Sequence, residues 1–173
     1  MKIENILLNP MQGTFMRNKI CSLIPMIFLL LILVSESPSA QIPQWENQLK
    51  TDPSNTELLL KLGKAYHDVA GENEDKEAVK KAEKYLSKLL EIEPGNALAM
   101  VYYGSVLTMK AREAFFPWDK MKYMKKGFAK MDSAVALDPG EPEVRLIRAI
   151  NSTSVPKMFN RLKLALSDFK DVR

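Results

Sequence analysis

The stretch "LEIEPGNALAM" (Leu90–Met100) decides the fold, because its form occurs three times in this chain. "VALDPGEPEVR" (Val135–Arg145) and "LKTDPSNTELL" (Leu49–Leu59) have the same order of an acidic residue, a proline, a small residue and a polar residue. Each copy ends one apolar helical pattern and opens another. Proline is tolerated at the start of a helix but not in its interior. The three copies therefore mark turns between helices.

Between these turns the apolar residues recur every three or four positions, and no run alternates as a strand does. Ser54 and Glu57 form an S-x-x-E pattern, which predicts a capping box at the start of one helix. Gly71 is expected to end that helix, Asn73–Asp75 to begin its partner, and Asn96 to cap the next. Short turns favour antiparallel pairs. The sequence thus predicts an all-α domain built of helix hairpins.

Alignment of the hairpins on their closing prolines brings out a longer pattern. The first hairpin contains "LLLKLGKAY" and then "AEKYLSKLLEIEP", which together place Leu59, Leu62, Gly63, Tyr66, Ala82, Leu86 and Pro94. This spacing resembles the tetratricopeptide repeat (TPR), whose pattern is W-x2-L-G-x2-Y, then A-x3-F, then P. The second copy has Met100, Tyr103, Gly104, Leu107, Gly127, Met131, Ala134 and Pro139. The resemblance implies a TPR-like stack of antiparallel helix hairpins, a fragment of a right-handed α-solenoid.

The spacing of the hairpins departs from the family. The closing prolines are 41 and 45 residues apart, whereas the family repeats every 34 residues or so. The surplus is close to whole helical turns, so the helices can lengthen without rotating their apolar faces. Small residues are expected to let the paired helices approach closely, with Gly63 against Ala82 and Gly104 against Gly127.

The third unit departs further from the repeat. In "EPEVRLIRAINSTSVP", Arg145 and Arg148 stand where apolar residues are expected, and they either point outward or pair with acids such as Glu143 or Asp168. The stretch "PKMFNRLKLALSDF" then has the spacing of an amphipathic closing helix, with apolar residues at Met158, Phe159, Leu162, Leu166 and Phe169. Because repeat arrays end in atypical caps, we interpret this unit as a diverged final hairpin.

The first forty residues have the pattern of a secretory signal peptide. Ile20–Val34 is an uncharged apolar run that follows Arg17 and Lys19 and precedes the small-residue stretch "SESPSA". An uncleaved membrane anchor is the alternative, although the run is shorter than the roughly 20 residues of a membrane span. We expect an exported protein that is periplasmic or secreted. A protein that stays anchored in the membrane is the open alternative.

The expected domain boundaries follow from the apolar segment and the prolines. Residues 1–40 are the signal peptide and residues 41–173 the TPR-like domain. The domain divides into a half-repeat cap, two repeats and a diverged terminal repeat, at 41–53, 54–94, 95–139 and 140–173. The alternative translation starts are Met1, Met11 and Met16.

The composition argues against several function classes. The chain has 25 basic and 21 acidic residues, and a net charge of +4 is too small for the basic stripe of a nucleic-acid-binding protein. One histidine and one cysteine leave few ligands for a transition metal. His67 stands beside Asp68, but adjacent helical side chains point about 100° apart and no nucleophile is indicated. We therefore expect no cofactor and no catalysis.

The resemblance to TPR proteins implies a binding scaffold whose first helices line a concave groove. The groove residues would be Leu60, Lys64, His67, Val101, Ser105, Thr108 and Ile150. The basic clamp with which some family members hold an acidic chaperone tail is absent, since Leu60, Val101 and Ser105 stand where its residues are wanted. The surface favours an unidentified protein or peptide with an apolar or helical segment. Ordinary solvated surface is the alternative interpretation.

A second candidate surface is the turn in "KAREAFFPWDKMKYMKK" (Lys110–Lys126), where Phe115, Phe116 and Trp118 are flanked by basic residues. The aromatic residues either form a contact for a protein or a membrane surface, or they seal the lengthened hairpins to each other. The sequence as a whole predicts a non-enzymatic interaction scaffold in an extracytoplasmic assembly. The alternative is a membrane-associated adaptor that docks through the N-terminal helix or through Phe115–Trp118.

Overall fold

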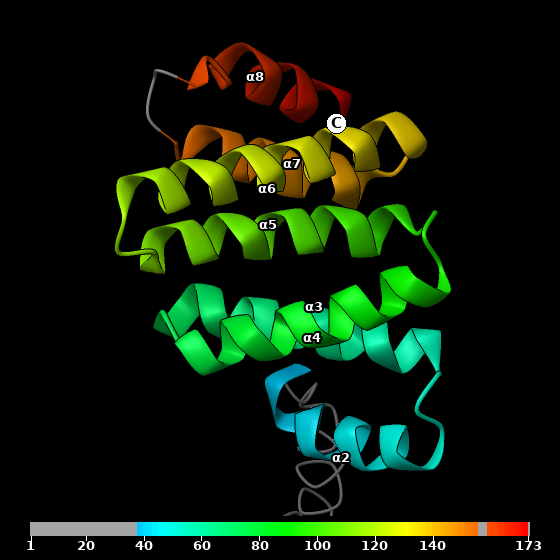
Figure 1. The fold of residues 1–173 in the computed structure, drawn as a ribbon. Coiled ribbons are helices and arrows are strands. Elements are labelled where there is room, and N and C mark those ends of the chain that lie inside the picture. The colour runs from blue at the N-terminus through cyan, green and yellow to red at the C-terminus, as the bar shows by residue number, and fades with distance from the viewer. Residues whose placement is uncertain (1–37, 156–158, 173) are drawn as a thin grey trace, which may run out of the picture. The chain divides into compact units, whose positions relative to one another are not determined.

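The computed structural model describes residues 38–155 and 159–172, which form seven α-helices and no strand. The helices are α2 (Pro38–Thr51), α3 (Thr56–Asn73), α4 (Lys76–Ile92), α5 (Ala97–Glu113), α6 (Pro117–Leu137), α7 (Pro142–Thr153) and α8 (Leu162–Asp171). Figure 1 shows three hairpins, α3–α4, α5–α6 and α7–α8, stacked in chain order after α2. The predicted all-α stack is confirmed. Residues 1–37 of the expected signal peptide lie outside the described residues.

The three repeated stretches are turns, as the sequence predicts. In the stretch Leu90–Met100 the N–H of Asn96 donates to the carbonyl oxygen of Glu93 at 3.1 Å, which closes the turn over Pro94. The side chain of Asn96 then accepts the N–H of Ala99 at 2.9 Å and caps α5. Proline fixes the backbone of the turn, and the asparagine satisfies a helix N–H group that has no partner inside the helix. One short stretch therefore ends one helix and starts the next.

Two details of the first hairpin differ from the sequence prediction. Asn55, and not Ser54, caps α3. The helix begins at Thr56, so Asn55 stands directly before it, and its side-chain oxygen accepts the N–H of Leu58. Gly71 does not end α3, which continues until the chain turns at Glu74 with a φ of 53° in the left-handed region. Asp75 then caps α4. The local caps work as expected, displaced by one to three residues.

The apolar core runs through the stack and joins the hairpins. Its fully buried large side chains come from α3, α4, α5, α6 and α7, and they are Leu59, Leu62, Leu86, Leu89, Val101, Val106, Met131 and Val144. α5 contributes the most buried residues of any described helix and packs against α3, α4, α6 and α7. It is therefore the central helix of the stack.

Glycine permits a backbone-to-backbone contact between α5 and α6. A Cβ atom on Gly104 would lie 2.7 Å from the carbonyl oxygen of Gly127, and one on Gly127 would lie 2.6 Å from that of Gly104. Both distances are below any normal carbon–oxygen contact, so the predicted Gly104–Gly127 pairing is confirmed. Gly63 also permits close packing, but against the side chain of Leu86 instead of the predicted Ala82. Ala82 lies one helical turn before Leu86 on the same face.

We expect Gly104→Ala to destabilise the fold by about 2 kcal/mol or more, because the added methyl group meets backbone atoms that cannot rotate away. Gly71→Ala is the matched control: this glycine also lies inside a helix, and the nearest atom to an added Cβ is 3.8 Å away. Alanine has the better helix propensity by about 1 kcal/mol, so the control is neutral or stabilising. Urea unfolding measures both, and equal effects would contradict the close contact.

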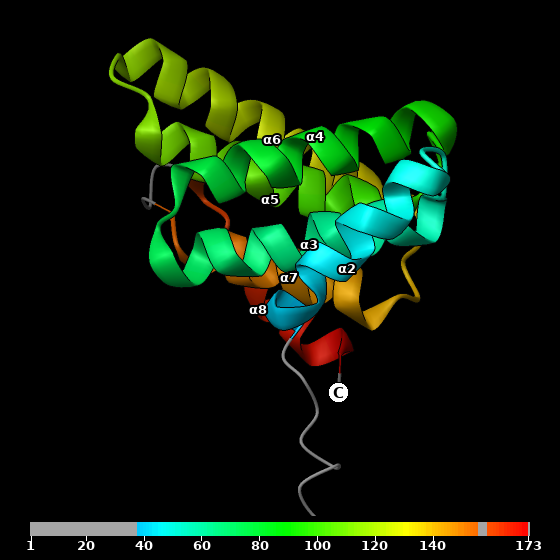
Figure 2. The same cartoon turned by 90° about the horizontal axis from the view of Figure 1, so that it is seen from below.

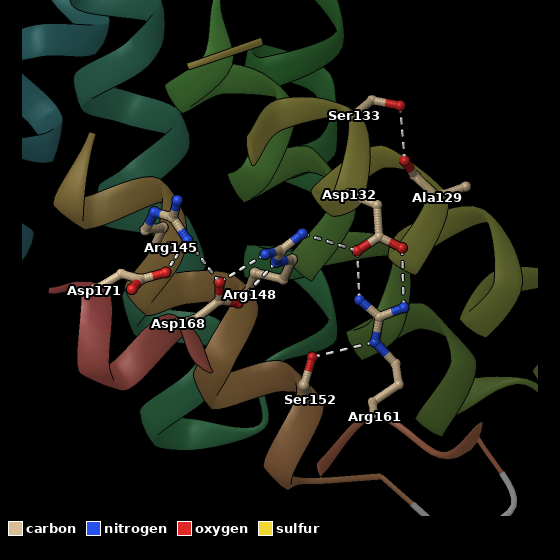
Figure 3. A network of polar contacts seen from close by, with 9 residues as sticks. All are labelled: Ala129, Asp132, Ser133, Arg145, Arg148, Ser152, Arg161, Asp168 and Asp171. Carbon is tan, nitrogen blue, oxygen red and sulfur yellow. Dashed lines mark hydrogen bonds and ion pairs between the residues drawn. The ribbon is translucent and has the colours of Figure 1, made fainter. Parts of the chain in front are cut away.

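Charged side chains hold the last hairpin to the stack (Figure 3). Arg148 on α7 donates to both carboxylate oxygens of Asp168 on α8, at 2.6 and 2.8 Å, and both side chains are buried. Arg148 also reaches Asp132 of α6 at 3.3 Å, and Arg161 binds Asp132 through two further N–H groups. A buried carboxylate is costly unless it is paired. The position of Asp168 therefore fixes how α8 is rotated about its own axis.

Arg145 extends this ionic network. Its Nη1 donates to Asp168 at 3.2 Å and to Asp171 at 2.8 Å, while its Nε donates to the carbonyl oxygen of Pro139. Burial alone would lower the pKa of Arg148, but the hydrogen bonds and negative charge of Asp168 outweigh it and raise that pKa above its ordinary value. The sequence alternative in which both arginines pair with Asp168 is the one that the structure adopts.

We expect Arg148→Met to cost about 3–5 kcal/mol, because it leaves the buried carboxylate of Asp168 without its main partner. The double change Arg148→Met with Asp168→Leu removes both charges, and it is expected to be less destabilising than Arg148→Met alone. Chemical denaturation of the parent protein, Arg148→Met, Asp168→Leu and the double variant gives the coupling between the two positions. Additive effects of the two single changes would contradict a direct buried ion pair.

Candidate functional site: partner-binding surfaces

The seven predicted groove residues come from the first helices of the three hairpins, as expected. α3 carries Leu60, Lys64 and His67, α5 carries Val101, Ser105 and Thr108, and α7 carries Ile150. The three residues of α5 are buried, so the expectation that they line an accessible groove is wrong. Leu60 is half-buried, and among the seven only Ile150 is classed as exposed. The reason lies in contacts between α3, α5 and α7.

A polar bridge joins α3 to α7 across α5. The Nζ of Lys64 lies 2.5 Å from a carboxylate oxygen of Glu143, and the hydroxyl of Tyr102 donates to the same oxygen at 2.6 Å. Partial burial acts to raise the pKa of Glu143, but hydrogen bonds from Lys64 and Tyr102 hold it below its ordinary value. Burial raises the pKa of Tyr102, and Glu143 adds to the effect. The first and third hairpins are thus tied together over the expected groove.

A second set of hydrogen bonds joins the same three helices, α3, α5 and α7. Nε2 of His67 lies 2.8 Å from the hydroxyl of Ser105, and the amide of Asn151 donates to that hydroxyl at 3.0 Å. Thr108 donates to the amide oxygen of Asn151 at 2.7 Å. Buried polar groups need such partners. Ser105 and Thr108 therefore join α5 to α7 and are not presented to a ligand.

His67 also lies 3.0 Å from a carboxylate oxygen of Asp68, which corrects the expectation that these neighbours point apart. Asp68, His67 and Ser105 are thus arranged in the order of an acyl-transfer triad. A nucleophilic serine must reach a substrate carbonyl, however, and Ser105 is only 1% exposed, with its hydroxyl already bonded to Asn151. In this packed state the three groups are a hydrogen-bonded part of the helix interface.

The aromatic tip, which we define as Phe115, Phe116 and Trp118, lies at the turn between α5 and α6. The three side chains are 87%, 45% and 65% exposed. Phe116 stacks on Trp118 with ring centroids 4.5 Å apart, and Phe115 meets Phe116 edge to face at 5.0 Å. Their rings contact one another, and all three side chains are exposed to solvent. The interpretation in which they seal the lengthened hairpins is therefore wrong.

A further apolar surface lies on α8, and we call Leu162, Leu166 and Phe169 the α8 stripe. All three are exposed, Leu166 to 54%, whereas Ala165 and Asp168 face the domain. The sequence predicts the apolar face but not its direction, because the pairing of Asp168 with two arginines rotates the helix. Lys163 and Lys170 are exposed on the same helix. The stripe is thus an apolar surface with a basic border.

Side chains of α4, α5 and α6 line a cleft of about 510 Å³. Its charged groups include Glu83 and Lys110, which bind each other at 2.7 Å, and the ammonium of Lys110 lies over the ring of Tyr123. No sequence signal marks this cleft, because its lining comes from helices that are separate in the chain. The central ion pair is satisfied within the protein.

The described residues contain neither a metal-binding cluster nor a helix that could span a membrane. No group of three or more histidine, cysteine or acidic side chains in residues 38–155 and 159–172 is placed to hold a metal ion. Among the helices of the same ranges, none is both long and apolar enough to cross a bilayer.

Comparison with solved structures defines the fold class. The crystal structure of a thermophilic TPR protein from Thermus thermophilus superposes on 86% of this chain and 71% of its own with a TM-score of 0.65, at 15% sequence identity. No protein-family model matches the sequence, and a comparison with curated proteins found no match. The chain therefore has a TPR-like fold, as its repeat pattern predicts. A fold of this kind is typical of protein–protein interaction scaffolds.

The polar bridge between α3 and α7 is expected to make the stability of the protein depend on pH in the acid range. Because the pKa of Glu143 is lowered in the folded state, its contribution to stability is complete above the unfolded pKa of about 4.3 and is lost as the pH falls through the folded pKa. We expect Glu143→Gln to destabilise the protein at neutral pH and to matter progressively less below pH of about 4. Thermal unfolding at several pH values measures the difference. Glu72→Gln, which removes an exposed carboxylate of α3, is the control and should leave that pH dependence unchanged.

Proposed function

We propose that this protein is a non-enzymatic interaction scaffold of an extracytoplasmic assembly. The TPR-like fold supports the scaffold role, and the signal-like pattern of residues 1–40 supports export. The single observation that carries the proposal is the α8 stripe, an apolar surface at the open end of the helix stack. In repeat arrays the next hairpin would cover such a surface. We propose that a partner segment covers the α8 stripe in a similar way.

The proposed partner segment is an amphipathic helix. Apolar anchors at i, i+4 and i+7 match the contact of one helix with another, and the stripe has this spacing at Leu162, Leu166 and Phe169. The basic border formed by Lys163 and Lys170 is complementary to acidic residues along one edge of the partner.

The groove predicted from the sequence is less accessible to a partner than the α8 stripe. Lys64 is engaged by Glu143, and His67 by Ser105, so a ligand would first have to displace contacts inside the protein. Leu60 and Ile150 are the groove residues that are neither fully buried, as Val101 is, nor engaged in such a bond among the described contacts. They remain the part of the groove hypothesis to which a partner has access. The burial of Ser105 supports a role without catalysis.

A photo-crosslinking amino acid at Leu166 tests the scaffold proposal in living cells. We expect a discrete protein adduct in the extracytoplasmic fraction from Leu166, a weaker one from Ile150, and none from Gln44, an exposed residue of α2 at the other end of the stack. Leu162→Glu should abolish the adduct at Leu166 because it places a charge in the apolar contact.

The control variant is Ser167→Glu, which adds the same charge at a neighbouring exposed position of α8. It should leave the adduct in place. Equal adducts from Leu166 and Gln44, or an adduct that survives Leu162→Glu, would overturn the assignment of the stripe. Recovery of the protein only in the cytoplasm would overturn the extracytoplasmic part of the proposal. Circular dichroism of each variant confirms that the helices are intact.

A further inference from the structure

The positive charge of this chain is concentrated at one hairpin end, Lys110–Lys126, which contains the aromatic tip. This segment has six basic and two acidic residues, a net charge of +4. The whole chain also has a net charge of +4, so the remaining residues balance one another. Arg112, Lys120, Lys122, Lys125 and Lys126 are all exposed. A nearly neutral protein thus carries one local cationic surface.

The cations and the aromatic rings share one side of the hairpin end. Trp118, Lys122 and Lys125 follow the i, i+4, i+7 spacing and lie on one face of α6, whereas Gly127 lies on the opposite face against α5. The rise of the helix places Lys122 about 6 Å and Lys125 about 10 Å along the axis from Trp118. Figure 2 shows this end of α6 projecting away from the other hairpins. The order from the tip inward is aromatic, then basic.

That order matches the depth profile of a membrane surface. Tryptophan and phenylalanine partition into the interface between headgroups and hydrocarbon, and lysines further out meet anionic headgroups. Each basic residue near an anionic surface strengthens binding about fivefold, and screening by salt weakens that contribution. Neither the insertion of the rings nor the attraction of the cations to anionic headgroups requires a binding partner of one particular shape. The exposed rings at the turn and the excess of a single charge sign favour a lipid surface over a protein pocket.

From this arrangement we propose that the hairpin end Lys110–Lys126 docks on an anionic membrane, with the aromatic tip inserted at the interface and the lysines of α6 against the headgroups. The proposal gives the sequence alternative of a membrane-associated adaptor a defined surface. It is independent of the α8 stripe, which comes from a different hairpin. A scaffold that binds a partner through α8 and a membrane through the α5–α6 turn would hold that partner at the membrane.

The test uses the full-length chain and a signal that comes from the tip alone. With Trp45→Phe as background, Trp118 is the remaining tryptophan, so its fluorescence reports the tip even if the N-terminal segment also binds lipid. We expect a blue shift and quenching by brominated lipids on phosphatidylcholine vesicles that contain about a third phosphatidylglycerol. On phosphatidylcholine alone the response should be at least tenfold weaker. High salt should reduce the binding to anionic vesicles.

A matched pair of variants separates local docking from net charge. Lys122→Glu with Lys125→Glu and, on α4, Lys84→Glu with Lys88→Glu change the net charge equally. We expect the first pair to weaken the quenching response tenfold or more and the second pair to change it less than threefold. Phe116→Ser should reduce the depth to which Trp118 inserts, as reported by quenching with brominated lipids. Absence of quenching on anionic vesicles, or equal losses from the two charge reversals, would overturn the proposal, while the crosslinking result at α8 is unaffected by either.

Discussion

The contact between the backbones of Gly104 and Gly127 is the constraint on which the rest of the stack depends. Any side chain at either position would meet a carbonyl oxygen at less than 3 Å, so α5 and α6 can approach this closely only because both residues are glycine. α5 also packs against α3, α4 and α7, and nearly all of its faces are therefore used inside the protein. The central helix is therefore mainly a structural element, and most of its side chains are buried against its neighbours.

The burial of α5 explains why the expected groove is largely closed. In a stack of hairpins the first helices lie side by side, and their free side chains face whatever enters the concavity. Here Lys64 on α3 and Glu143 on α7 bridge over Tyr102 of α5. Two hairpins that are separated by a third one in the chain are thus joined directly, by a charged pair with a hydroxyl between them. Most of the expected groove is thus occupied by contacts within the protein.

The sequence predicts the local features of this fold well and the long-range ones poorly. Turns over Pro53 and Pro94 depend on a few adjacent residues, and apolar periodicity defines each helix, so both are accessible from the sequence alone. The direction of the α8 stripe is not, because it depends on Asp168 pairing with arginines about twenty residues away. The exposure of the aromatic tip depends on how the α5–α6 hairpin ends relative to its neighbours. Such distances between hairpins are not encoded in any one segment.

The ends of the stack are where this chain departs from a regular array. Its last hairpin buries Arg148 and Asp168 and partly buries Arg145, although apolar residues are expected at both arginine positions, and it leaves apolar residues outside. Buried ion pairs add little net stability compared with apolar packing, but they fix one orientation, since a rotated α8 would leave a buried charge unpaired. The orientation they fix exposes Leu162, Leu166 and Phe169. Specificity in the interior and an uncovered apolar surface on the outside are therefore two consequences of the same exchange of charged for apolar residues.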